Sequence, residues 1–477
     1  MIDSTEMAVV DRNAVALGVP ETNLMESAGA AVARTVRKLG DGNDEVAIVA
    51  GRGNNGGDAL VAARFLADLD PVVHLLGHPD RIRSEVTREK WSALERAEIE
   101  RVVVRDSTGL DLGGPDVIVD GILGTGVSGA PREPERTAIE SVNERGATVV
   151  AVDVPSGMDV DTGETPGVAI EADRVVTFHD LKPGLADREA VTVASIGIPE
   201  AASRFVGPGD LLRLDRPLDA HKGDFGRVLV VGGGPYTGAP ALAAQAALRA
   251  GADLATVLAP ETVADEIQSY SEDLIVEAVP GRKVGPEHVE TIVTAARERD
   301  VLVLGPGLGD VADTHRAVRE VVESYSGRVV LDADAIDAIR DVETDASVIC
   351  TPHRGEFVNL GGEQGNSREE WVSAAASLAD ELAVTILLKG PHDVITDGET
   401  TRIGRTGNPG MTVGGTGDVL AGVTGAMFAT LDPVQAGSLG AYLTGTAGDL
   451  AGEARDSGLL ATDLLETLPA ALRGENP

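Results

Sequence analysis

Cysteines, apolar runs of membrane length and secretory signals are scarce or missing in this sequence. The chain of 477 residues has a single cysteine, Cys350, which excludes an internal disulfide and a zinc site built from cysteines. No apolar run approaches the roughly 20 residues of a membrane-spanning helix. The first residues, MIDSTEMAVVDRN, lack the basic and apolar segments of a secretory signal. We therefore expect no membrane partner and a location in a reducing compartment, the cytoplasm.

Positive charge is also scarce. The chain has 40 Lys and Arg, of which six are Lys, against 77 Asp and Glu, and its net charge is −37. A field of this sign repels nucleic acid and anionic membranes, so we expect no nucleic-acid partner. The acids are spread along the chain without a block of about five like charges, which argues against an acidic tail. A surface adapted to concentrated salt is the favoured interpretation, and a site for basic partners is the alternative.

Length and pattern indicate two α/β domains. The chain exceeds the roughly 100–200 residues of a typical domain. Short runs rich in β-branched residues alternate with helical stretches, which is typical of mostly parallel sheets. A segment rich in Gly and Pro at 197–220 interrupts this pattern. We predict one domain at 1–215 and a second at 216–477. In the first we expect a helix pair at 5–17 and 23–39, then strands at 45–50, 72–77, 100–105, 116–122, 147–154 and 173–179.

The sequence GRGNNGGDA at 51–59 lies between an expected strand and an expected helix. Backbone N–H groups and the helix dipole at such a glycine-rich turn bind anions, usually phosphate. The acid that a dinucleotide-binding loop places about 20 residues further on is missing, which disfavours an ordinary dehydrogenase. Asn54, Asn55 and Asp58 make the loop unusually polar. A turn that only connects strand to helix is the alternative interpretation.

Two further polar loops follow later strands of the same expected sheet, DGILGTGVSGAPR at 120–132 and DVPSGMDVDTG at 153–163. Ligands bind beyond the carboxyl ends of the strands in an open parallel sheet, so the three loops predict one pocket. Asp120 and Asp153 end their strands and are expected to point into it. Asn55, Asp120 and Ser156 offer hard oxygen and amide ligands, which suit a hard cation better than zinc. A helix cap or a turn is the alternative role for each Asp.

The second half carries polar segments after several of its expected strands. The sequence GGGPYTG at 232–238 lacks the Gly-Lys-Ser/Thr ending of a Walker-type nucleotide loop. GPGLG at 305–309 and TPHRGEF at 351–357 each end a strand, and the latter brings His353, Arg354 and Glu356 to the rim. A structural role is the alternative for His353. Lys389 begins the segment KGPHD after another strand, where its charge is placed to meet a nucleotide phosphate.

The most specific motif is NPGMTVGGTGDVLAGVTGAM at 408–427. Gly414, Gly415 and Gly417 lead into a helix that we expect to begin near Asp418. Backbone donors and the positive end of the helix form an anion hole, and Asp418 lies beside any transferring phosphoryl group as a base. A carboxylate at that position is unfavourable unless it handles a proton. An ordinary helix-capping Asp is the alternative.

These motifs, in this order, resemble a known family of fused enzymes. The first half resembles the NAD(P)H-hydrate epimerase domain, and the second resembles the ribokinase-like, nucleotide-dependent NAD(P)H-hydrate dehydratase. Together they resemble the prokaryotic NAD(P)H-hydrate repair enzymes over nearly the full length, and the acidic composition resembles a haloarchaeal version. The expected fold is therefore an N-terminal Rossmann-like three-layer α/β domain followed by a ribokinase-like α/β domain.

The resemblance implies two reactions on reduced nicotinamide cofactor that is hydrated at ring carbon 6, written NADHX and NADPHX. The first domain is expected to interconvert the R and S epimers. The second is expected to dehydrate the S epimer with ADP, releasing AMP and phosphate, and magnesium is expected to accompany the ADP. We also expect a homo-oligomer. The alternative is a ribokinase-like kinase of a small molecule with a non-catalytic N-terminal binding domain.

The resemblance also implies site residues in the first domain. Asp120 is the expected acid or base of epimerisation, and no lysine near it in the sequence could share the proton transfer, so His78 and Arg132 are the nearest candidates. Asn55, Asp120 and Ser156 are expected to hold a potassium ion. The hydrate is expected to bind Asn54, Asn55, Gly56, Gly57, Asp58, Gly124, Thr125, Gly126, Val127, Ser128, Gly129, Ala130 and Asp153.

In the second domain, the resemblance implies that Asp418 deprotonates the 6-hydroxyl group, which then attacks the terminal phosphate of ADP. The hydrate is expected near Ala239, Gly307, His353 and Asp418. The adenine nucleotide is expected at Lys389, Gly390, Pro391, His392, Asp393 and Gly417. Prokaryotic members of the family generally use ADP, which favours ADP over ATP here.

Overall fold

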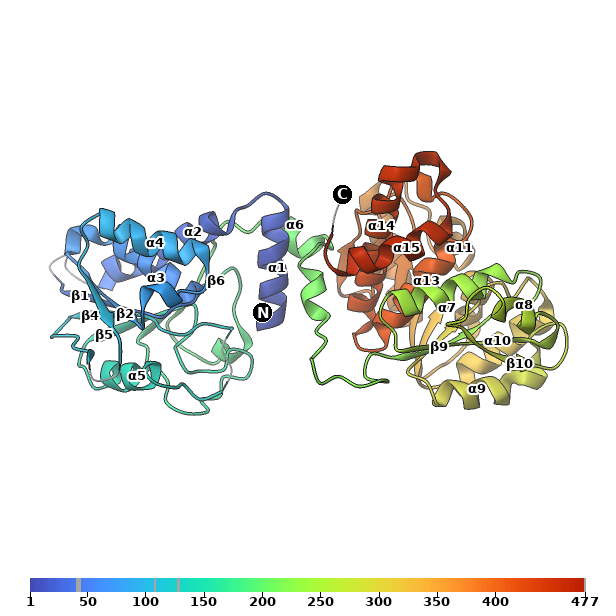
Figure 1. Cartoon of the computed structure of the whole chain (residues 1–477), viewed down its shortest axis with the longest axis horizontal. Coiled ribbons are helices and arrows are strands. Elements are labelled where there is room, and N and C mark those ends of the chain that lie inside the picture. Colours follow the sequence, from blue (N-terminus) through green and yellow to red (C-terminus); the bar gives the residue numbers. More distant parts are fainter. Residues whose placement is uncertain (40–43, 107–108, 127–128, 476–477) are drawn as a thin grey trace. The chain divides into compact units, whose positions relative to one another are not determined.

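The computed structural model describes residues 1–39, 44–106, 109–126 and 129–475. Contacts divide the chain into two compact units, residues 1–202 and 203–477, and each is an α/β fold (Figure 1). The predicted boundary at 215 lies later than this division. Residues 203–214 belong to the second unit because Val206 N–H donates to Ile403 O at 3.0 Å and the buried Asp210 pairs with Arg402 at 2.9 Å.

The first unit contains a parallel sheet of seven strands in the order β3-β2-β1-β4-β5-β6-β7. Central strands such as β1 are buried on both faces, as is typical of parallel sheets. The edge strand β7 was not predicted from the sequence. The strands are β1 (Val46–Ala50), β2 (Val72–Leu76), β3 (Arg101–Val104), β4 (Val117–Gly121), β5 (Thr148–Val152), β6 (Arg174–Phe178) and β7 (Val191–Ala194).

Helices cover both faces of this sheet, which confirms the predicted three-layer architecture. Figure 1 shows α2, α3 and α4 on one face and α5 on the other. The predicted N-terminal helix pair is present, and α1 packs into the core through Met7, Val10 and Ala14. The helices are α1 (Ser4–Ala16), α2 (Glu21–Leu39), α3 (Asn54–Phe65), α4 (Glu85–Arg96), α5 (Glu135–Asn143) and α6 (Ala201–Arg204).

The second unit contains a sheet of nine strands in the order β10-β9-β8-β11-β12-β13-β14-β15-β16. The strands are parallel as far as β14, and β15 and β16 add to it in antiparallel pairs. They are β8 (Arg227–Val231), β9 (Leu254–Pro260), β10 (Ile275–Val279), β11 (Val301–Leu304), β12 (Arg328–Leu331), β13 (Ser347–Cys350), β14 (Thr385–Leu388), β15 (Val394–Thr396) and β16 (Thr401–Ile403).

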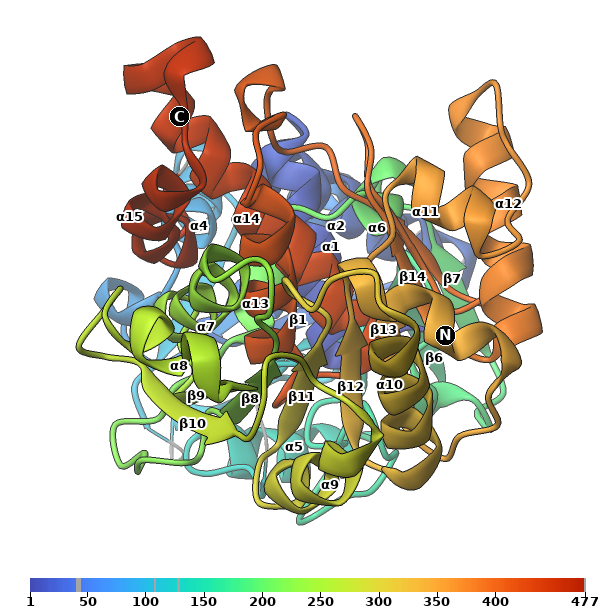
Figure 2. The ribbon, with the colours of Figure 1, turned by 90° about the vertical axis from the view of Figure 1, so that its right-hand side faces the viewer.

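Two hydrophobic clusters flank this second sheet. One packs α7, α13, α14 and α15 against it, and the other packs α9, α10, α11 and α12, of which α9 and α10 face the viewer in Figure 2. The helices are α7 (Gly238–Arg249), α8 (Glu261–Gln268), α9 (Val289–Arg297), α10 (Ala312–Ser324), α11 (Arg354–Asn359), α12 (Arg368–Leu382), α13 (Thr416–Phe428), α14 (Pro433–Arg455) and α15 (Ala461–Leu472).

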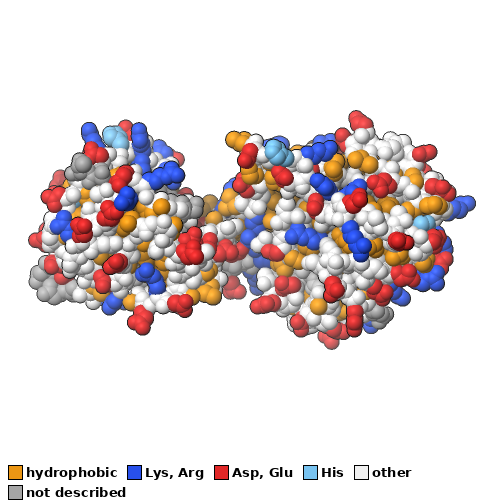
Figure 3. Space-filling model, turned by 90° about the horizontal axis from the view of Figure 1, so that it is seen from below, with side chains coloured by type: hydrophobic (Ala, Val, Ile, Leu, Met, Phe, Trp, Pro, Cys, Tyr) orange, Lys and Arg blue, Asp and Glu red, His pale blue; other side chains and the backbone are white. Residues whose placement is uncertain are grey.

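Asp and Glu side chains are scattered over both units in the view of Figure 3, with Lys and Arg interspersed. Within the part of the chain that the structure describes, no helix combines the length and the apolar character that a membrane crossing requires.

Candidate active sites

The glycines of GRGNNGGDA allow two segments of backbone to approach closely at the carboxyl end of β1. A Cβ atom on Gly51 would lie 1.9 Å from Ile122 O, and one on Gly56 would lie 2.1 Å from Gly51 O. Both contacts are with backbone and leave no room for a side chain. The helix α3 begins at Asn54, so that NNGGD forms its first turn and aims N–H groups beyond the sheet.

Asp120 lies at the end of the neighbouring strand β4, and its side chain is fully buried. Its carboxylate accepts hydrogen bonds from Ser156 Oγ at 2.5 Å, Ser156 N at 2.9 Å and Ile122 N at 3.1 Å. Burial raises the pKa of Asp120 to about 6, and the hydrogen bonds from Ser156 and Ile122 oppose this rise. The group can therefore both hold and release a proton close to neutral pH.

Asn55 and Ser156 extend this buried cluster to the backbone of Leu123. Asn55 Nδ2 donates to Leu123 O at 2.7 Å, and Ser156 Oγ lies 3.1 Å from the same carbonyl oxygen. The Leu123 N–H donates in turn to Ser156 Oγ at 2.8 Å. A carboxylate, a hydroxyl and a carbonyl oxygen thus converge beside a side-chain amide. The donor set suits a hard monovalent cation, and the predicted group of Asn55, Asp120 and Ser156 is brought together.

A buried lysine at the end of β6 was missed in the sequence. Lys182 is fully buried, and its Nζ donates to Phe178 O at 2.5 Å and lies 3.0 Å from Asp153 Oδ1. Asp153 also accepts a hydrogen bond from Thr177 Oγ1 at 3.0 Å, and it adopts a φ of 61°. Only six lysines occur in the chain, and this one follows an expected strand, a signal that could have identified it. The earlier candidate His78 instead lies on the exposed surface beside Asp80.

Carboxylates from three other helices lie close to this ion pair. Burial and the negative charge of Asp153 raise the pKa of Asp11, on α1, to about 7. Burial, followed by the charges of Asp153 and Asp11, raises the pKa of Asp58 well above its ordinary value. Glu21 adds to both effects, and it accepts a hydrogen bond from Asn54 Nδ2 at 2.8 Å. Lys182 pairs with Asp153, and its charge also lowers the pKa of Asp11.

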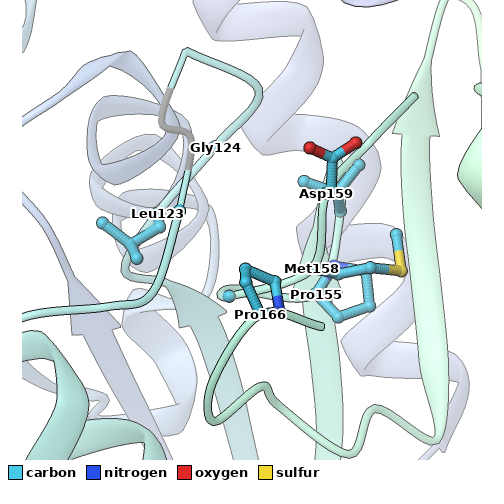
Figure 4. Close-up of a pocket in the computed structure, with 9 residues that line it drawn as sticks. Leu123, Gly124, Pro155, Met158, Asp159 and Pro166 are labelled. Atoms are coloured by element: carbon cyan, nitrogen blue, oxygen red, sulfur yellow. The ribbon is translucent and has the colours of Figure 1, made fainter. Parts of the chain in front are cut away.

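A small cavity of about 10 Å³, room for about one water molecule, lies beside the Ser156 cluster. Figure 4 shows Leu123 and Gly124 on one side and Pro155, Met158 and Asp159 on the other. Of the predicted loop at 124–130, Gly124 and Gly129 line this pocket, whereas Val127 and Ser128 lie outside the described residues. The lining residues are Leu123, Gly124, Gly129, Val154, Pro155, Gly157, Met158, Asp159 and Pro166.

In the second unit, Asp418 lies in the first turn of α13. The helix is preceded by Gly415, whose φ of 98° favours glycine. Burial raises the pKa of Asp418 to about 7, and the charge of Asp332 adds to this rise, while Lys389 opposes it. Lys389 lies beside this helix start, because its Nζ would lie 3.5 Å from a Cβ atom on Gly417.

Lys389 also contacts an acid that the sequence analysis did not single out. Its Nζ donates to Asp332 Oδ1 at 3.1 Å, and Thr351 Oγ1 donates to the same oxygen at 2.6 Å. Burial lowers the pKa of Lys389, but the charges of Asp332 and Glu356 outweigh it and raise the pKa above its ordinary value. Asp332 and Asp334 follow the strand β12, beyond the carboxyl end where ligands bind in parallel sheets, so this position could have indicated them.

The loop at 305–309 lies against these acids. A Cβ atom on Gly305 would lie 1.8 Å from Asp332 O, and Gly309 N–H donates to Asp334 Oδ2 at 2.7 Å. In the same loop, a Cβ atom on Gly307 would lie 3.3 Å from Ala239 Cβ. The predicted pair of Ala239 and Gly307 is therefore brought together.

His353 caps the helix α11 beside Lys389. Its Nδ1 accepts from Glu356 N–H at 3.0 Å, and its own N–H donates to Glu356 Oε2 at 2.7 Å. The imidazole is 61% exposed, and Lys389 N–H donates to the preceding carbonyl, Pro352 O, at 2.8 Å. The histidine thus has a structural role as a helix cap, and its exposed ring lies at the edge of the candidate site of the second unit.

The segment KGPHD at 389–393 forms a turn after β14. Gly390 N–H donates to Asp393 Oδ1 at 2.9 Å, which closes the turn over Pro391 and His392. Burial raises the pKa of Asp393 to about 6. In the described residues, no group of three or more His, Cys, Asp or Glu side chains is arranged to hold a metal ion.

Comparisons with known proteins agree with this division into two sites. Residues 21–184 match the family described as YjeF-related protein N-terminus, and residues 228–470 match the family described as NAD(P)H-hydrate dehydratase. A relative from Methanothermobacter thermautotrophicus, named bifunctional NAD(P)H-hydrate repair enzyme, is 43% identical over 98% of this chain and 94% of its own length. The chain belongs to the bifunctional NAD(P)H-hydrate repair enzyme family.

Other family members and structures support the same assignment. A repair enzyme from Pyrobaculum aerophilum is 43% identical over 99% of this chain and 98% of its own length. A solved structure of the ADP/ATP-dependent NAD(P)H-hydrate dehydratase of Bacillus subtilis, co-crystallized with ATP and Mg²⁺, is 27% identical with a TM-score of 0.50 and covers 57% of this chain and 98% of its own. A ribokinase-like superfamily protein from Enterococcus faecalis is 26% identical with the same score and covers 57% of this chain and 95% of its own.

Membership of the repair enzyme family confirms the predicted fold class and the two activities. The first unit is an NAD(P)H-hydrate epimerase and the second, ribokinase-like unit is an NAD(P)H-hydrate dehydratase. The alternative of a small-molecule kinase with a non-catalytic N-terminal domain is not favoured, because the relatives are bifunctional over nearly their full length.

Proposed function

We propose that the second unit dehydrates the S epimer of NADHX or NADPHX with ADP as the phosphoryl donor. The proposal rests on the position of Asp418, a carboxylate in the first turn of α13 with a pKa raised to about 7 beside Lys389. Asp418 removes the proton of the 6-hydroxyl group, and the oxygen attacks the β-phosphorus of ADP. The bond to the bridging oxygen breaks and AMP leaves. Phosphate then departs from ring carbon 6, a proton leaves carbon 5, and the reduced nicotinamide is restored.

This function is tested by incubating the purified protein with ADP and hydrated NADH. We expect the near-ultraviolet absorbance of reduced nicotinamide to return, with AMP and inorganic phosphate formed in equal amounts. ATP in place of ADP is the matched comparison, because the side chains of the anion hole do not themselves decide the donor. Formation of a stable phosphorylated hydrate without free phosphate would instead support a kinase.

The groups that would bind the substrates follow from the same contacts. The hydrate is assigned to Ala239, Gly307 and His353, and the adenine nucleotide to Gly417 and the turn at 389–393. Magnesium normally binds through nucleotide phosphates with one or two carboxylates. Asp332 and Glu356, the acids that act on Lys389, fit that role. The ion would neutralise charge on the phosphates when it is bound.

In the first unit, we assign the exchange of R and S epimers to Asp120 and the pocket beside Ser156. The hydrate is assigned to the first turn of α3 at 54–58, the loop at 124–130 and Asp153. Opening or dehydration of the ring at carbon 6 requires a proton to move, and Asp120 is poised to move it because its pKa is about 6. The pair of Lys182 and Asp153 supplies a second proton-handling group at this end of the sheet.

Potassium is assigned to the oxygen cluster of Asp120, Ser156 and Leu123, next to Asn55. We expect replacement of K⁺ by tetramethylammonium at constant ionic strength to slow epimer exchange at least severalfold, since the buried Asp120 carboxylate then lacks a counter-charge. Ser156→Ala is expected to raise the K⁺ concentration required for full exchange, measured by chromatographic separation of the epimers. Ser92→Ala, at an exposed hydroxyl on α4, is the matched control. Exchange that is independent of K⁺ would contradict the assignment.

The remaining expectations about the chain stay predictions. The cytoplasmic location rests on the single cysteine, and the adaptation to concentrated salt rests on the net charge of −37. The homo-oligomeric state can be measured by light scattering at several salt concentrations.

A further inference from the structure

Arg354 places an uncommitted positive charge next to the turn assigned to the nucleotide. It is the first residue of α11, and its side chain is exposed. A Cβ atom on Gly390 would lie 3.5 Å from both Nε and one terminal nitrogen of its guanidinium. The arginine therefore borders the backbone of the residue that follows Lys389.

The guanidinium is held in place by an aromatic ring rather than by an acid. Its Cζ lies 4.8 Å from the ring centroid of Trp371 on α12, and Trp371 packs edge-on against Phe357 with ring centroids 6.0 Å apart. Stacking of this kind fixes the orientation of the planar group without neutralising it. In the described parts of the chain Arg354 forms no ion pair.

An unpaired arginine at this position is unusual, because the molecule has a large net negative charge. Acids outnumber bases by 77 to 40, and Lys182 and Lys389 are each already paired with an acid. Lys389 is the nearest example, since its Nζ is bound by Asp332 at 3.1 Å. Arg354 therefore places a positive charge beside the turn, and no acid pairs with it in the described parts of the chain.

We propose that Arg354 binds phosphate oxygens of the adenine nucleotide that occupies the turn at 389–393. The inference rests on the proposed ADP-dependent dehydration and adds a residue that determines affinity for the donor. A planar guanidinium presents paired N–H donors that match phosphate oxygens, which a lysine ammonium does not. The hydrate also carries phosphates, but the contact with Gly390 assigns the arginine to the nucleotide.

The test compares Arg354→Ala with the wild-type enzyme and with Arg316→Ala, an exposed arginine on α10 that gives the same change in charge. For Arg354→Ala we expect the KM for ADP to rise about tenfold, with kcat and the KM for the hydrate nearly unchanged. Calorimetry of ADP binding should show the same loss of affinity without turnover. The difference should shrink in concentrated salt, which screens an exposed contact.

Arg354→Lys keeps the positive charge but removes the planar guanidinium, so it separates the effect of geometry from that of charge. It also provides the test if the alanine variant is unstable. We expect it to recover only part of the affinity for ADP. Unchanged ADP affinity in Arg354→Ala, or a rise only in the KM for the hydrate, would overturn the inference while the proposed function stands. If the wild-type protein neither binds ADP nor uses it, the proposed function fails first and the assignment of Arg354 falls with it.

Discussion

Replacing Asp418 by Asn is expected to reduce ADP-dependent dehydration by about 10²–10⁴-fold, the usual contribution of a general base. The variant keeps the size of the side chain and a hydrogen-bonding group at the start of α13, so the helix and the anion hole should persist. Epimer exchange in the first unit should be unaffected, because Asp418 lies in the second unit. The two reactions are measured separately by nicotinamide absorbance and by chromatography of the epimers.

The pH dependence of the wild-type enzyme tests the same role. Asp418 acts as a base only when it is ionised, and burial and the charge of Asp332 raise its pKa to about 7. Dehydration should therefore rise as the pH increases through about 7 and fall away below it. Asp332→Asn removes a neighbouring negative charge, so the rise of the dehydration rate with pH should shift to lower pH.

Asp432→Asn provides the control for the alternative that Asp418 only caps a helix. Asp432 is exposed, precedes α14 and accepts a hydrogen bond from Gln435 N–H at 2.9 Å, so it is a helix cap outside the anion hole. We expect Asp432→Asn to change stability by about 1 kcal/mol or less without loss of dehydration. Equal and small effects of the two substitutions would assign Asp418 to capping.

Much of the fold was predictable because parallel strands are buried on both faces. The run VAIVA at 46–50 is buried throughout and forms β1 as expected. The edge strand β7 was not predicted, since its residues are partly exposed and its pattern is less apolar. The domain boundary was placed too late for a different reason. Residues 203–214 look like a linker, yet the pair of Asp210 and Arg402 joins positions 192 residues apart.

The site was predictable where glycine marks a close approach of backbone. Gly51, Gly305 and Gly415 each occupy a place that a side chain would obstruct or strain, and each lies in a predicted motif. Lys182 was missed although it follows an expected strand, and Asp11 was missed because nothing in its local sequence distinguishes it. Their importance comes from burial near Asp153, which is fixed by the packing of α1 and of the segment after β6.

Two carboxylates of the first unit, Asp120 and Asp153, are candidates for the proton transfer. Asp120 is fully buried and bonded to Ser156, whereas Asp153 is partly exposed and paired with Lys182. Both carboxylates lie at the carboxyl ends of adjacent strands. On the proposed function, one of them donates or accepts the proton, and the other positions the substrate or balances charge.

Asp120→Asn is expected to slow epimer exchange by about 10²–10⁴-fold and to leave dehydration of the S epimer intact. An amide cannot release or take up the proton. Its NH₂ group would also face the N–H of Ile122 or Ser156, from which the carboxylate accepts a hydrogen bond. Because this mismatch also costs about 1–3 kcal/mol, folding of the variant must be checked by thermal denaturation. Exchange is followed from the pure R epimer by chromatography.

Two further variants decide between the candidates in the first unit. Asp116→Asn makes the same substitution beside the opposite end of β4, where the exposed Asp116 accepts a hydrogen bond from Glu45 N–H at 3.0 Å, and exchange should be unchanged. Lys182→Met removes the buried cation and should raise the pKa of Asp11 further, because the opposing charge of Lys182 is lost. If Asp120→Asn retains exchange while Lys182→Met abolishes it, the proton transfer belongs to the pair of Asp153 and Lys182, and Asp120 acts only through the oxygen cluster.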